Sequence, residues 1–142
     1  MANRNNDFKH SPRRQFLLIA SLYAALNGFS WLLTSSASRE QALTVMPDLF
    51  GSAFIGGLMV FTAVVTLVAV FRHKRWGKEI EALAFGALLG TCAYIGVVFL
   101  GSTVVAILTN GELGSLTGWV SALSYLLVAG FFSIVSRWEE KK

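Results

Sequence analysis

The chain alternates between long apolar blocks and short segments that hold nearly all of its charge. Four blocks contain no Asp, Glu, Lys, Arg or His: Phe16–Thr34, Leu49–Phe71, Ala82–Gly111 and Leu113–Ser136. A helix of about 20 predominantly apolar residues crosses the hydrocarbon core of a membrane. Lipid offers no hydrogen-bond partner to backbone N–H and C=O groups, so these groups must be paired within the protein. Four strands could not close a barrel, so each block is expected to be helical. The pattern predicts an all-α membrane protein with four transmembrane helices in an antiparallel bundle.

The expected spans are residues 16–34, 49–71, 82–108 and 115–136, which together form one transmembrane domain, 16–136. A basic N-terminal segment, 1–15, precedes this domain, and a charged tail, 137–142, follows it. The third span is long for a bilayer, because a helix from Ala82 to Leu108 would measure about 40 Å. We expect it to tilt, to bend near a glycine or to extend beyond the membrane.

The composition also favours a membrane protein over a soluble one. Hydrophobic residues make up 54% of the chain and Asp, Glu, Lys and Arg only 14%, whereas soluble domains are about 25% charged. The mean hydropathy is +0.59. The single cysteine, Cys92, excludes an intramolecular disulfide and a cysteine-based zinc cluster. We expect it to serve as a small apolar side chain.

Basic residues lie on one side of the expected topology. Eleven of the twelve Lys and Arg residues fall in segments 1–15, 72–78 and 137–142, and Arg39 is the exception. Cytoplasmic loops carry an excess of Lys and Arg, so both termini are predicted to be cytoplasmic. The net charge of +4 then indicates contact with anionic lipid of the inner leaflet. The basic groups are split among three short segments, which argues against nucleic-acid binding.

The four tryptophans lie near the expected ends of the spans. Trp31 and Trp119 fall at outer ends, and Trp76 and Trp138 just beyond inner ends. Tryptophan is enriched at the level of the lipid headgroups. We therefore expect these four residues to anchor the helices at the interfaces, although any one of them could instead fill a protein contact.

The segment Arg13-Arg14-Gln15-Phe16-Leu17 resembles the twin-arginine export motif. Three further spans follow with no soluble domain between them, so nothing in the chain requires folded export. We interpret the two arginines as cytoplasmic anchors of the first span, which is then expected to remain in the mature protein.

The sequence offers little that could perform chemistry. An ionisable side chain inside a span would indicate a functional site, and the four blocks contain none. His10 and His73 lie among basic residues that would repel a metal ion. Glu79 and Glu81 start the third span, where a carboxylate complements the helix dipole. We expect no catalytic residue, metal or cofactor, and therefore no enzyme.

Small residues form one face of the third span. They fall within about 100° of one another on a helix: Ala82, Gly86, Gly90, Ala93 and Gly101, together with Val97. A row of small residues with a G-x-x-x-G pair lets another helix approach closely. The face could serve packing within one bundle, association between copies, or both. The opposite face carries Leu88, Ile95 and Phe99, which suit lipid or a core.

Asn27 is the one amide side chain inside a span. It shares a face with Ala24 and Trp31. We expect it to form an interhelical hydrogen bond, and a pore-lining role is the alternative.

The order of these features resembles small four-span, holin-like membrane proteins of phages that infect actinobacteria. The resemblance lies in Asn27-Gly28 at the end of the first span, Met46-Pro47 before the second, and the basic hairpin Arg72–Lys78, which leads into Glu79, Gly86 and Tyr94. It implies a non-enzymatic protein that accumulates in the bacterial inner membrane, self-associates and permeabilises it. It assigns no functional residue.

Three functions therefore remain open at the level of the sequence. The leading hypothesis is a holin-like protein that oligomerises through the small-residue face. The rival is a structural or accessory subunit of a larger membrane complex, or a superinfection-exclusion protein, whose partner would be a different membrane protein. The third hypothesis, a small channel or transporter, is supported only by Asn27 and the hydroxyl residues of the spans.

Overall fold

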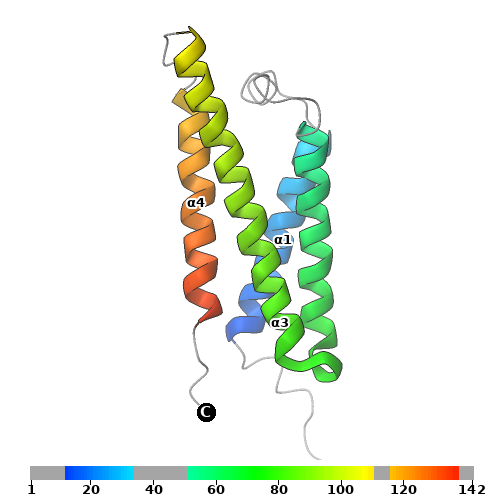
Figure 1. The fold of residues 1–142 in the computed structure, drawn as a ribbon. Helices are drawn as coiled ribbons and strands as arrows, with labels where there is room; N and C mark the ends of the chain where they lie inside the picture. Colours follow the sequence, from blue (N-terminus) through cyan, green and yellow to red (C-terminus); the bar gives the residue numbers. More distant parts are fainter. Residues whose placement is uncertain (1–11, 34–50, 111–115, 138–142) are drawn as a thin grey trace, which may run out of the picture.

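The computed structural model describes residues 12–33, 51–110 and 116–137, and every regular element in these ranges is an α-helix (Figure 1). Helix α1 covers Pro12–Leu33, α3 covers Ser52–Asn110 and α4 covers Leu116–Ser136. Pro12 suits the first position of α1, since the N–H that proline lacks would have no partner inside the helix there.

Helix α3 doubles back on itself and contains two spans. Its first leg, Ser52–Phe71, and its second leg, Glu79–Val105, are joined through residues 72–78, where Figure 1 shows the ribbon reversing direction. The hydroxyl oxygens of Thr62 and Thr91 are 2.7 Å apart. A straight helix would separate these residues by about 44 Å, so the legs must lie side by side and antiparallel.

The predicted four-helix architecture is confirmed. Pro12–Leu33, Ser52–Phe71, Glu79–Val105 and Trp119–Ser136 are each long and apolar enough to cross a membrane. They run alternately up and down, so α1 begins and α4 ends at the same end of the bundle (Figure 1). The first helix begins at Pro12 rather than residue 16, and the third span begins at Glu79 rather than residue 82.

Helices α1 and α4 pack mainly against α3, and they meet each other at the end where α1 begins. Two apolar clusters fill the interior. One lies toward the end where α1 begins and includes Leu17, Phe85, Leu88 and Phe132. The other lies toward the opposite end and includes Trp31, Ile55, Ile95 and Phe99. Aromatic side chains bridge the helices, with Phe16 against Phe85, Phe131 and Phe132.

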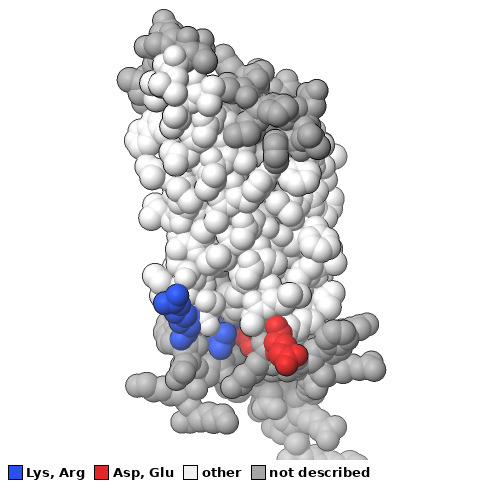
Figure 2. Space-filling view, in the orientation of Figure 1, with Lys and Arg blue, Asp and Glu red and all other residues white. Residues whose placement is uncertain are grey.

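The outer surface of the bundle is also rich in large apolar side chains. Large hydrophobic side chains on every span are exposed, among them Leu33 at 80%, Phe71 at 68% and Leu127 at 74%. Contiguous apolar surface of this extent marks contact with a membrane or a partner. Figure 2 shows the described charged side chains gathered at one end of the molecule, below an uncharged surface. These residues are Arg13, Arg14, Glu79, Glu81 and Arg137. We call this end the charged end.

Candidate helix-packing face and the polar clasp

Three glycines allow helices to touch inside the bundle. A Cβ atom added at Gly28 would lie 2.8 Å from the Val60 side chain and 2.9 Å from its backbone nitrogen. At Gly56 it would lie 3.0 Å from the carbonyl oxygen of Gly28, and at Gly96 it would lie 2.8 Å from Leu126. Gly28 and Gly56 therefore form the close crossing of α1 and the first leg of α3, and Gly96 forms that of the second leg and α4.

The small-residue face of the second leg points away from the bundle. Ala82, Gly86 and Gly90 are exposed, whereas Ala93 and Gly101 are half-buried. Apart from the adjoining backbone of the same helix, no atom lies within 4 Å of a Cβ position built at Gly86 or at Gly90. These two glycines are not used for packing within the bundle, which was one of the two interpretations of their spacing. The surface they form is open to whatever surrounds the protein.

The opposite face of this leg forms the core. Leu88 is 2% exposed, Ile95 0% and Phe99 4%. Of the two environments that suited these residues, lipid or a core, the structure selects the core.

Among the described residues, the side chain of Asn27 bonds within its own helix and not, as expected, to another span. Its Nδ2 atom donates to the carbonyl oxygen of Tyr23 in the same helix, at 3.0 Å, in an exposed position. The buried polar contact between spans is instead made by Thr62 and Thr91, at 2.7 Å. An amide can satisfy itself on the preceding turn of its own helix, and nothing in the sequence around Asn27 reveals that choice.

The tryptophans differ from one another in their environments. Trp31 is only 4% exposed and packs against Phe99, with ring centroids 5.9 Å apart. Trp31 therefore fills a protein contact, the alternative that was open for any one of the four, and its position at the headgroup level stays a prediction. Trp119 is 40% exposed. The side chain of Trp76 and the whole of Trp138 lie outside the described residues.

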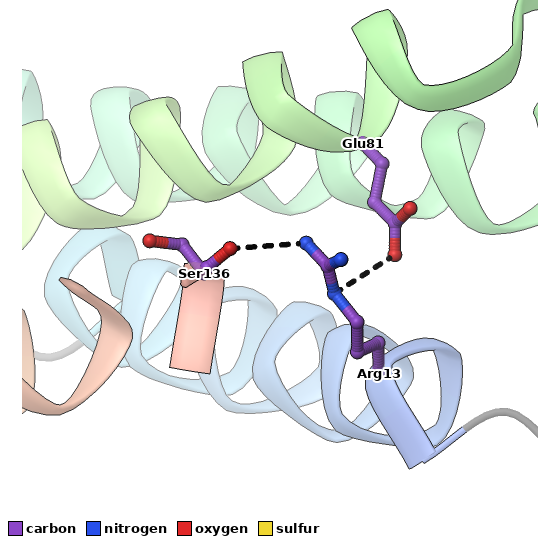
Figure 3. A network of polar contacts seen from close by, with 3 residues as sticks. All are labelled: Arg13, Glu81 and Ser136. Carbon is purple, nitrogen blue, oxygen red and sulfur yellow. Dashed lines mark hydrogen bonds and ion pairs between the residues drawn. The ribbon is translucent and has the colours of Figure 1, made fainter. Parts of the chain in front are cut away.

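Arg13 joins three spans at the charged end of the bundle (Figure 3). Its Nη2 atom donates to the carbonyl oxygen of Ser136 at 3.2 Å, and its Nε atom lies 3.6 Å from Oε1 of Glu81. The guanidinium carbon lies 5.4 Å from the ring centroid of Phe85, within the range of a cation–π contact. We call Arg13, Glu81, Phe85 and Ser136 the clasp.

The clasp is partly withdrawn from solvent, which strengthens the attraction between the charges of Arg13 and Glu81. The Arg13 side chain is 25% exposed and that of Glu81 is 10% exposed. Ser136 is the last residue of α4, where carbonyl groups have no partner inside the helix and a cation is favourable. One guanidinium thus forms an ion pair with a carboxylate and a hydrogen bond to a helix terminus.

Sequence reasoning did not find the clasp. In the sequence, Arg13 and Arg14 are equivalent, as anchors or as a twin-arginine signal, and Glu81 is explained by the helix dipole alone. In the structure Phe16 and Leu17 also face inward, so three residues of that motif are used in tertiary packing. An acidic residue at the edge of an apolar block is a weak signal for an ion pair, and it does not select one arginine among several.

Other chemistry is sparse in the described part of the chain. There, no three His, Cys, Asp or Glu side chains lie close enough to hold a metal ion. Cys92 is buried, at 4% exposure. The hydroxyls of Thr66, Ser102 and Thr103 donate to carbonyl oxygens one turn earlier in their own helix.

Comparisons with known proteins do not extend this description. The chain matches no protein-family model, and no curated protein or solved structure is significantly similar to it. Functional inference therefore rests on the geometry of the bundle.

Proposed function

We propose that this chain is a small, non-enzymatic integral membrane protein that self-associates in the inner membrane of a bacterium and acts as a holin-like permeabilising protein. The observation that carries the proposal is the open surface at Gly86 and Gly90. Elsewhere in the described bundle, Gly28, Gly56 and Gly96 lie where two spans approach closely. Gly86 and Gly90 have the same character and no partner within the bundle.

A packed interior supports the view that permeability arises between copies. Leu17, Ile55, Met59, Leu88 and Ile95 are among the largest fully buried side chains. A close-packed interior of this kind leaves little room for water. A hole in the membrane would then require several bundles to surround it, which is consistent with self-association through an outward face.

Charge segregation supports the proposed orientation. The described charges lie at one end of the bundle, and in the sequence the other basic residues of segments 1–15, 72–78 and 137–142 directly precede or follow helix ends located there. We propose that this end faces the cytoplasm and contacts anionic lipid of the inner leaflet, so that both termini are cytoplasmic.

The second candidate is an accessory subunit or a superinfection-exclusion protein. The same open glycine surface would accept a helix of a different membrane protein, so the geometry of the face favours it equally. The channel or transporter alternative has weaker support, because Asn27 is bonded to its own helix on the outside of the bundle.

One experiment tests the leading proposal against the second. The wild-type chain and a Gly86→Leu/Gly90→Leu double variant would be expressed at matched levels, and membranes would be treated with a lysine-reactive crosslinker while dye uptake and viability are followed. We expect the wild type to give a ladder of oligomers and abrupt dye entry at a threshold of expression. The double variant should insert normally and give neither, because leucine side chains block close approach.

Gly57→Leu is the matched control, since Gly57 is also exposed with no atom within 4 Å of its Cβ position but lies on the first leg. It should behave as the wild type does. Oligomer ladders that persist in the double variant would show that this face does not mediate association. Benign accumulation of the wild type, with one other protein co-purifying in fixed ratio, would favour the accessory subunit.

A further inference from the structure

The second leg of α3 is apolar on both of its faces. Leu88, Ile95 and Phe99 face the core, whereas Gly86 and Gly90 face outward. Lipid tails are as apolar as a leucine side chain, so burial alone barely distinguishes one rotation of such a helix from another. The rotation of this leg must be decided by close packing and by polar contacts.

The clasp holds the core face of this leg. Glu81 and Phe85 lie one helical turn apart and both contact Arg13 of α1. At 3.6 residues per turn, the direction of Glu81 and Phe85 lies roughly 140° around the helix from that of Gly86 and Gly90. A contact that holds the first pair inward therefore directs the second pair outward.

Contacts between α1 and this leg follow a constant register. Arg13 meets Glu81, Phe16 meets Phe85 and Trp31 meets Phe99, so the two helices run parallel. The clasp adds α4 to this pair through the carbonyl oxygen of Ser136. It is a charged contact at the end of the bundle nearest to Gly86, whereas the Trp31–Phe99 contact lies near the other end.

We propose that the clasp is a conformational latch that sets the rotation of the second leg of α3. With the latch closed, Gly86 and Gly90 are presented to the bilayer. With the latch open, the leg can turn and bring its small-residue face against the rest of the bundle, which hides the surface on which association depends. This inference rests on the proposed self-association, although the latch itself is measurable in a single copy of the chain.

A disulfide between the two legs reports the rotation. The hydroxyl oxygens of Thr62 and Thr91 are 2.7 Å apart, so Thr62→Cys and Thr91→Cys place two sulfur atoms within bonding reach in the described rotation. Disulfides tolerate only a narrow separation and direction of the two Cβ atoms. Cys92→Ala in the same chain removes the competing thiol. The rate of oxidation would be followed by mass spectrometry of detergent-solubilised protein.

In this background we expect Arg13→Ala and Glu81→Gln each to slow disulfide formation several-fold. Arg14→Ala is the matched control, because it removes the same charge from the same segment without touching the clasp, and it should leave the rate unchanged. Arg13→Glu should also slow the reaction, and Arg13→Glu combined with Glu81→Arg should restore it at an unchanged net charge. Such a rescue would not follow from a general loss of folding.

Equal rates for Arg13→Ala, Glu81→Gln and Arg14→Ala would overturn the latch. Crosslinking of the same membranes separates this result from the fate of the proposed function. A chain that gives no oligomers as wild type, but whose disulfide rate depends on Arg13, retains the latch and refutes self-association. If both proposals hold, Arg13→Ala loses the oligomer ladder and Arg14→Ala keeps it.

Discussion

Glycine residues in this chain serve opposite purposes according to their position. Gly28 lies against the backbone of the first leg of α3, where the missing side chain permits contact. Gly57 lies one residue after Gly56 and has no neighbour at its Cβ position. Gly28 and Gly57 are the same residue type and differ only in the atoms that the fold places beside them.

A matched pair of substitutions tests this difference. We expect Gly28→Ala to destabilise the bundle by about 1–3 kcal/mol, because the added methyl group meets backbone that cannot move aside. Gly57→Ala should be neutral or stabilising by about 0.4–1 kcal/mol, since alanine restricts the unfolded chain. Unfolding in mixed micelles by titration with a denaturing detergent measures both. Equal shifts for the two variants would contradict the close crossing at Gly28.

Arg13 and Arg14 likewise show that two identical charged residues can have different contacts in the fold. They are adjacent and identical, yet Arg13 joins α1 to Glu81 and to the end of α4. A consecutive residue on a helix is turned by about 100°, so the two side chains cannot reach the same partners.

At the scale of elements, α3 is the part of the structure least visible in the sequence. Hydropathy predicted two spans separated by a basic loop. The structure has one helical run, Ser52–Asn110, that folds back through residues 72–78. The spans themselves were predictable because an apolar block of sufficient length has no better environment than the membrane. The helical character of the connection is a local backbone choice that hydropathy does not report.

Thr62 and Thr91 hold the two legs of α3 together by a buried hydrogen bond. We expect Thr91→Val to cost only about 0.6 kcal/mol and at most about 1.7, since interhelical hydrogen bonds in membranes are weak. Ser124→Ala is the control, because the Ser124 hydroxyl is exposed and donates to Val120 in its own helix. The same micelle titration measures both variants. A loss for Thr91→Val no larger than that for Ser124→Ala would show that this contact does not stabilise the pair.

For the whole molecule, the distribution of charge defines one end of the bundle, and the proposed orientation assigns that end to the cytoplasm. Fusions of alkaline phosphatase, which is active only outside the cytoplasm, check the assignment. We expect fusions after residue 142 and after residue 75 to be inactive and a fusion after residue 112 to be active. A shared compartment for residues 142 and 112 would contradict the even number of crossings. A reversed pattern would invert the orientation.

The sequence by itself determined that the chain has four helices long and apolar enough to cross a membrane, about where they lie, and that the basic residues fall in the short segments between and beyond them. These properties follow from how many apolar residues stand in a row and where the charges interrupt them. Only the tertiary structure decided that Gly86 and Gly90 face outward, that Trp31 is buried, that Asn27 bonds to its own helix and that Arg13 pairs with Glu81. In water an apolar residue indicates the inside of a protein, but in lipid both sides of a helix are apolar. The hydrophobic pattern of a span therefore does not show which face of the helix turns inward. Close packing and a few polar contacts decide this.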